Sequence, residues 1–178
     1  MQRRTLVLPF AAVVITALCV YATVRPYPPQ RRIRGPQEMR PAPLFELYDK
    51  QNRTVRLKAY VGRHRILVVF FDGEGGADRD PLLRRLRGDF ENLESDVKIL
   101  AVSTALPQHN RQADPFPFPL LSDPGLQVHR QWGRYDEQTE RPLTGVFHID
   151  RAGLVAWSDG HPQPLSDPND QINRLLDD

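Results

Sequence analysis

Four carboxylates lie within one short segment, DGEGGADRD, at residues 72–80. Clustered carboxylates are the ligands that Ca²⁺ and Mg²⁺ prefer, so Asp72, Glu74 and Asp78 are the candidates for a metal site. In an EF-hand register they would take positions 1, 3 and 7, but Ala77 then stands where that loop needs glycine. The pattern therefore favours a solvated turn over a metal site, and its negative charge disfavours a phosphate ligand.

The other side chains with catalytic potential are scattered along the chain. The five histidines show no i, i+4 spacing of the kind that holds a metal on one helix. His148 interrupts an apolar stretch, where a histidine is more often a structural residue than a catalytic one. Trp132 and Trp157 are interpreted as packing residues rather than as the lining of a binding cleft. The single cysteine, Cys19, leaves the chain without a thiol pair for electron transfer or an internal disulfide.

The acidic segment is expected to follow a buried strand and to precede a helix. RILVVFF, at 65–71, is a continuous apolar run, typical of a central strand covered on both faces. Asp80 followed by Pro81 is a typical helix start, with a capping carboxylate and a proline at the first helical position. VKILAVS, at 97–103, predicts a second buried strand. Between them, apolar residues recur at helical spacing at Leu82, Leu83, Leu86, Phe90 and Leu93.

Two further pairs of short segments have the pattern of hairpins. They are FELYD with TVRL around the turn KQNR, at 45–57, and GVFHID with LVAWS around the turn RAG, at 145–158. Asp167 and Pro168 then repeat the capping pattern before a last helix. A strand–helix–strand crossover, closed by an antiparallel hairpin and a final helix, predicts an α/β fold of the thioredoxin-like kind.

Longer segments of the chain occur in a recognisable order. They are APLFELYDKQNRTVRLKAYVGRHRILVVFF, KILAVST, PFPLLSDPGLQVHRQWG and FHIDRAGLV, spanning about residues 42–157. Together they resemble the peroxiredoxins, the alkyl hydroperoxide reductase and thiol-specific antioxidant family, and PFPLLSDP is the most specific of them. The resemblance implies a peroxiredoxin-type sheet flanked by helices.

The same resemblance places the family's reactive site in the acidic segment. Peroxiredoxins reduce peroxides with a cysteine thiolate in the first turn of the helix after the central strand, within the pattern P-x-x-x-[TS]-x-x-C. On that pattern Asp72 falls at the proline, Gly76 at the threonine or serine, and Arg79 at the cysteine. The family's arginine falls on Thr144. Because all four positions are substituted, we expect no catalytic residue, no bound cofactor and no peroxidase chemistry of the family kind.

The N-terminal part of the chain is expected to lie in a membrane. Thr5 to Val24 is a run without charge, long enough to cross a hydrocarbon core of about 30 Å as a helix. We expect residues 1–24 to form a transmembrane anchor; the alternative is a secretory signal cleaved after Ala22. Residues 25–41, rich in proline and arginine, are expected to be an extended linker, and residues 42–178 to form the domain. The domain is expected outside the cytoplasm, in the cell envelope.

The distribution of charge narrows the function classes. Residues 1–41 carry a balance of +6, whereas residues 42–178 carry −4, so the domain lacks the basic face that nucleic-acid binding requires. Our first hypothesis is a redox-inactive, membrane-tethered domain that binds a protein partner or a second copy of itself. The alternatives are an antioxidant or oxidoreductase activity by a route without cysteine, and a structural protein of the cell envelope.

Overall fold

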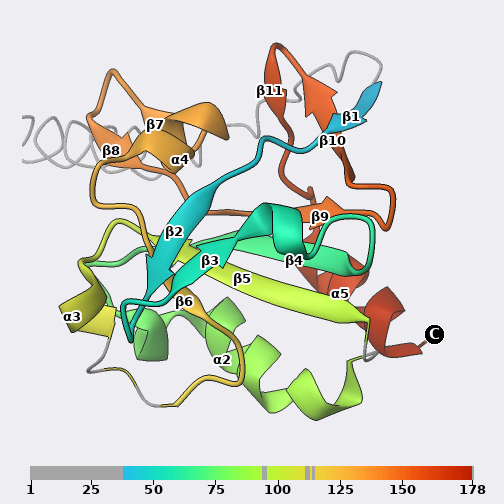
Figure 1. Ribbon diagram of the computed structural model, residues 1–178, viewed down its shortest axis with the longest axis horizontal. Helices are drawn as coiled ribbons and strands as arrows, with labels where there is room; N and C mark the ends of the chain where they lie inside the picture. Colours follow the sequence, from blue (N-terminus) through green and yellow to red (C-terminus); the bar gives the residue numbers. More distant parts are fainter. Residues whose placement is uncertain (1–37, 94–95, 111–112, 114, 178) are drawn as a thin grey trace, which may run out of the picture. The chain divides into compact units, whose positions relative to one another are not determined.

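The structure, a computed structural model, describes residues 38–93, 96–110, 113 and 115–177. Six strands form its main sheet in the order β3-β2-β6-β5-β4-β9 (Figure 1). Within it β4, β5 and β6 are parallel, while β2, β3 and β9 pair antiparallel with their neighbours. The strands are β2 (Glu46–Asp49), β3 (Thr54–Arg56), β4 (Arg65–Phe70), β5 (Val97–Ser103), β6 (Leu120–Ser122) and β9 (Gly145–Ile149). The predicted α/β sheet and its first hairpin are confirmed.

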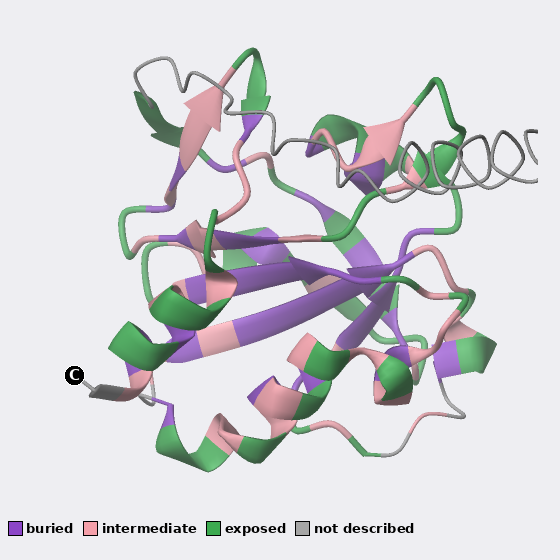
Figure 2. Ribbon diagram, turned by 180° about the vertical axis from the view of Figure 1, so that it is seen from behind, coloured by how far each residue is buried: buried purple, intermediate pink, exposed green. Residues whose placement is uncertain are grey.

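Helices cover both faces of this sheet. The helical elements are η1 (Leu57–Ala59), η2 (Ala77–Arg79), α2 (Pro81–Gly88), η3 (Phe90–Asn92), α3 (Pro107–Asn110), α4 (Gln127–Gln131) and α5 (Pro168–Asp177). One core cluster joins α2 and α5 to the sheet through Leu83 and Ile172. The other joins α4 to the opposite face, where Trp132 is fully buried with its ring centroid 5.0 Å from that of Phe147. The strands between them are largely buried (Figure 2), and the interpretation of Trp132 as a packing residue is confirmed.

Helix α2 begins where the sequence predicts and ends earlier. Asp80 Oδ1 accepts hydrogen bonds from the backbone N–H groups of Leu82 and Leu83, both at 2.9 Å, with a proline in the first turn. The apolar spacing extends to Leu93, but the α-helix stops at Gly88. Glycine is a poor helix former, and the chain continues as the 3-10 turn η3. Apolar spacing alone therefore overestimates the length of α2.

A second, smaller sheet contains β10 and changes the prediction for the 145–158 hairpin. Its strands are β1 (Glu38–Pro41), β10 (Leu154–Ser158) and β11 (His161–Pro162), in the order β1-β10-β11. The turn after β9 closes as predicted, because the N–H of Asp150 donates to the carbonyl of Leu154 at 3.0 Å. Beyond that turn, however, β9 pairs with β4 and β10 pairs with β1, so the predicted hairpin ladder does not form.

Strand β1 coincides with the last four residues of the segment predicted to be a linker. All four are exposed, yet they pair with β10 from Glu38 opposite Trp157 to Pro41 opposite Leu154. Arg40 also lies 5.9 Å from the ring centroid of Trp157. The folded part therefore includes residues that composition assigns to the linker. The small remaining sheet consists of β7 (Tyr135–Asp136) and β8 (Arg141–Pro142).

The predicted anchor, residues 1–24, and most of the predicted linker lie outside the described residues. Among the residues that are described, no helix combines the length and the apolar character needed to cross a membrane.

His148 is predicted to make the domain sensitive to acid. It lies in β9 opposite Leu67, and its Nε2 atom is buried without a hydrogen-bond partner in the described structure. Burial lowers the pKa of His148 below its ordinary value; Arg65 lowers it further, and Asp150 opposes the shift. The unfolded chain therefore binds the proton more readily, so the folded domain should lose stability as the pH falls below about 6.5.

We expect the substitution His148→Gln to reduce this loss, because glutamine does not titrate. Urea unfolding of both proteins at pH 7 and pH 5 measures it. The wild type should lose more of its free energy of unfolding between the two pH values than the variant does. Equal losses would show that the protonation of His148 does not limit stability in acid.

Candidate functional site

The loop of residues 72–80 lies after β4, at the carboxyl end of the central parallel strands, where open α/β sheets commonly bind ligands. Its backbone folds back on itself. Asp72 Oδ1 accepts a hydrogen bond from the N–H of Glu74 at 2.9 Å, and the N–H of Gly76 donates to the carbonyl of Gly73 at 3.3 Å. The turn η2 then leads into α2. The loop is thus a closed turn held largely by its own backbone.

Gly76, at the position of the family's threonine or serine, has a backbone conformation that those residues avoid. Its φ is 79° and its ψ is 150°. This region is accessible almost only to glycine, because a Cβ atom would collide with the backbone. A threonine or serine here would strain the turn. The backbone conformation at this position therefore favours the glycine that the sequence has.

The four positions that match the family site are divided between two adjoining pockets. Asp72 and Thr144 line a pocket of about 650 Å³, together with residues of the β7–β8 hairpin. Gly76 and Arg79 line a second pocket of about 610 Å³, together with residues of α3. Glu74 lines both. The structure thus places all four positions at one end of the sheet, although they do not form one cavity.

A guanidinium group does lie at this end of β9, but it belongs to Arg134. Nη1 of Arg134 donates to the carbonyl of Thr144 at 3.3 Å. A Cβ atom added to Gly145 would lie 3.2 Å from the same nitrogen. The arginine is therefore tied to the backbone beside the position where the family has its own arginine, and it comes from the segment after α4.

Two of the three carboxylates considered as metal ligands have other partners. Asp72 holds a loop N–H group, and Asp78 Oδ1 lies 3.5 Å from Nη1 of Arg87. Within the part of the chain that the structure describes, no three histidine, cysteine, aspartate or glutamate side chains gather closely enough to hold a metal ion. Two of the three carboxylates therefore have structural roles in or beside the loop.

The glycines of the loop provide a test of how tightly it is packed. A Cβ atom on Gly73 would lie 2.9 Å from the backbone nitrogen of Ala105 and 3.2 Å from Cβ of Ser103. On Gly75 its nearest neighbour would be an Asp72 oxygen at 3.7 Å. We expect Gly73→Ala to destabilise the domain by roughly 1–3 kcal/mol through overpacking, and Gly75→Ala by less than about 0.5 kcal/mol.

Urea unfolding of the two glycine variants measures this difference. Because both substitutions add the same methyl group to the same loop, Gly75→Ala is the matched control. Equal urea midpoints for the two variants would show that the backbone near Ala105 moves to accept the methyl group at residue 73 without loss of stability.

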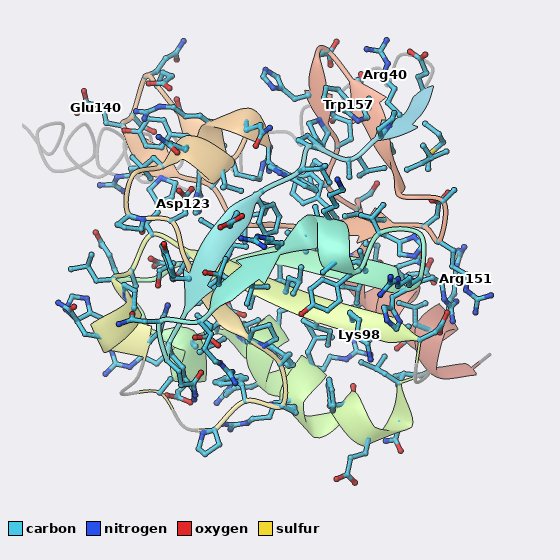
Figure 3. All side chains as sticks on the ribbon, viewed as in Figure 1. Arg40, Lys98, Asp123, Glu140, Arg151 and Trp157 are labelled. Carbon is cyan, nitrogen blue, oxygen red and sulfur yellow. The ribbon has the colours of Figure 1, made fainter. Side chains whose placement is uncertain are left out.

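A buried polar pair, Asp123 and His129, is not singled out by the sequence. Asp123 is 3% exposed and His129 is fully buried. Asp123 Oδ2 lies 2.8 Å from His129 Nδ1 and accepts the backbone N–H of His129 at 2.8 Å, while Oδ1 accepts the N–H of Gln127 at 3.1 Å. Asp123 therefore caps α4 and orients the histidine ring, which meets the ring of Phe70 at 5.0 Å. Figure 3 labels Asp123 above the sheet, on the face that carries α4.

Comparisons with known proteins agree with this fold. Residues 39–158 match the model of the AhpC/TSA family. The chain is 33% identical over 127 residues to alkyl hydroperoxide reductase E of Mycobacterium tuberculosis, and the match covers 66% of this chain and 81% of that protein. The same identity and coverage hold for alkyl hydroperoxide reductase E of Mycobacterium bovis.

Solved structures show the same architecture. The reduced 2-Cys peroxiredoxin of Plasmodium vivax superposes with a TM-score of 0.59 at 19% identity, covering 78% of this chain and 93% of that one. The mitochondrial 2-Cys peroxiredoxin of Plasmodium falciparum gives a TM-score of 0.55 at 18% identity, covering 78% and 90%. At such identities the superpositions concern the fold alone. With the family match, they lead to one conclusion: this chain belongs to the AhpC/TSA family and has a thioredoxin-like peroxiredoxin fold.

Proposed function

We propose that this protein is a redox-inactive member of its family that acts by binding another protein, or a second copy of itself. The observation that carries the proposal is that residues 39–158, which match the family, contain no cysteine. The family pattern assigns Arg79 to the position of the reactive cysteine, and it assigns the threonine or serine to Gly76, where the backbone conformation would strain either residue. A thiolate is the nucleophile that attacks peroxide, and a guanidinium has only donors to offer. The chain's single cysteine, Cys19, lies outside the family match.

Peroxide consumption tests the redox-inactive part of the proposal. The full chain in a Cys19→Ser background, which removes its only thiol, is expected to consume no hydrogen peroxide with dithiothreitol or thioredoxin. Adding Arg79→Cys should introduce a thiol that a maleimide probe labels, yet turnover should stay absent, because Gly76 and Thr144 still depart from the family pattern. Turnover by the protein without Arg79→Cys would overturn the proposal.

The face that carries the 72–80 loop is the proposed binding surface. Its exposed charged side chains include Asp72, Glu74 and Glu140 against Arg79 and Arg141, so a partner with an excess of basic residues would complement it. Figure 3 shows Glu140 and Arg151 toward opposite ends of the domain, which makes Arg151 a suitable distant control.

A pull-down from detergent-solubilised membranes, combined with sedimentation of the purified chain, tests this surface. Glu74→Arg is expected to weaken capture of the partner or self-association, and Arg151→Gln to leave it unchanged. If Glu74→Arg changes neither measurement, or if both variants weaken binding equally, the loop face is not the binding surface.

We also propose that residues 1–24 anchor the protein in a membrane, that the segment following them is a linker, and that the domain lies outside the cytoplasm in the cell envelope. The uncharged run from Thr5 to Val24 supports the anchor. The full chain is then expected to pellet with membranes and to resist alkaline carbonate extraction, and its domain should be accessible to protease added from outside. A soluble mature chain that begins at Thr23 would exclude the anchor.

A further inference from the structure

The pocket beside α3 contains a buried polar group that the fold does not fully use. Asn110 is 4% exposed and lines this pocket of about 610 Å³. Its Nδ2 donates to Ser122 Oγ at 3.1 Å. Its carbonyl Oδ1 accepts no hydrogen bond from another described residue, and it is not sealed from solvent. Because Asn110 lines the pocket, this acceptor can take a hydrogen bond from a ligand bound there.

Two opposite charges line the same pocket. They are the Glu74 carboxylate and the Arg79 guanidinium, both exposed, and neither side chain makes an ion pair or a hydrogen bond with another described residue. The neighbouring carboxylates differ in this respect, because Asp78 pairs with Arg87 and Asp80 caps α2. Of the charges in this loop, Glu74 and Arg79 are thus the ones left for a ligand.

These groups select a ligand by their chemistry. A guanidinium binds a carboxylate with charge-assisted hydrogen bonds, and a carboxylate together with an amide oxygen accepts from an ammonium group. A simple anion would be repelled by Glu74 and a simple cation by Arg79, whereas a zwitterion can pair with both. The other described residues of the lining are glycines, Ala77, Ala113, Asp78 and His109, and none of these has a large apolar side chain.

We propose that this pocket binds a small zwitterion of the α-amino acid class. Arg79 holds the carboxylate of the ligand, and Glu74 together with Asn110 Oδ1 holds its ammonium group. The inference goes beyond the proposed protein binding, with which it shares Glu74, because it concerns a small molecule inside one pocket.

Titration calorimetry with the full chain tests the proposal. A panel of free L-amino acids is first screened by thermal shift at millimolar concentration, and the one with the largest shift is titrated. Its N-acetyl derivative lacks the ammonium charge and its carboxamide lacks the carboxylate, so each is expected to bind roughly tenfold more weakly or worse. Absence of binding across the whole panel, or equal binding of the capped derivatives, overturns the proposal.

Substitutions connect the binding to the named side chains. Arg79→Gln and Glu74→Gln are each expected to weaken binding by about tenfold or more. Arg84→Gln is the matched control, because Arg84 is an exposed arginine of α2 that does not line the pocket. Circular dichroism of all three variants is the control for correct folding. If Arg84→Gln weakens binding as much as Arg79→Gln does, the ligand responds only to net charge and the site is refuted.

Discussion

Replacing Asp123 with alanine is expected to destabilise the domain by about 3–5 kcal/mol, because each buried donor left without its acceptor costs about 1–3 kcal/mol. Three donors lose their acceptor at once: the N–H of Gln127, the N–H of His129 and the ring Nδ1 of His129. The histidine ring is fully buried beside Phe70 and cannot turn to water instead. Urea unfolding monitored by tryptophan fluorescence measures the loss.

Two control variants identify the cause of that loss. Asp123→Asn keeps an acceptor for one of the donors and should cost less than Asp123→Ala. Asp136 accepts the N–H groups of Gln138 and Thr139 in a similar local turn, but at the surface, so Asp136→Ala should cost much less. If Asp123→Ala and Asp136→Ala prove equally destabilising, the burial of the Asp123–His129 pair does not explain the loss in the free energy of unfolding.

Replacing Gly153 with alanine is expected to destabilise the domain by roughly 2–5 kcal/mol, because backbone strain and overpacking act together. Gly153 lies in the turn between β9 and β10 with a φ of +82°, where L residues are strained. An added Cβ atom would also lie 2.5 Å from Cγ1 of Val61, a contact that requires something to move. Thermal and urea unfolding both measure the effect.

Gly160 separates the two contributions, since its φ of +80° is almost the same and a Cβ atom there would meet nothing within 4 Å. Gly160→Ala should therefore show only the strain, about 1–2 kcal/mol. Combining Gly153→Ala with Val61→Ala removes the clashing methyl group and should recover part of the stability. Equal losses at the two glycines, with no recovery in the double variant, would exclude a steric clash at Gly153.

The two central strands of the main sheet could be predicted from local sequence. β4 and β5 are continuous apolar runs, as expected for strands that are buried on both faces of the sheet. The partner of β10 could not be predicted in this way. The turn between Asp150 and Leu154 fixes the reversal of the chain, but not which sheet the next strand joins. β1 could not be predicted either, because an exposed edge strand carries no apolar pattern.

The sequence predicts that the candidate loop lies between β4 and α2, but it does not predict the conformation of the loop or the pockets beside it. The capping role of Asp80 follows from residue type alone, and it is confirmed. The left-handed φ of Gly76, the division into two pockets and the open acceptor of Asn110 all depend on tertiary packing. The sequence analysis did not identify the Asp123–His129 pair, because a spacing of six residues across a helix start matches neither helical nor strand periodicity.

Strand β1 has a mechanical consequence for the domain. It is the first described element, and it pairs with β10 instead of joining the six-stranded sheet. A pulling force applied at Glu38 along the strand would therefore act first on the β1–β10 ladder. In that direction the ladder is loaded in shear, so its hydrogen bonds resist together instead of opening one by one. Because the ladder is only four residues long, it should separate before the main sheet, which lengthens the chain ahead of β2 while the core of the domain stays folded.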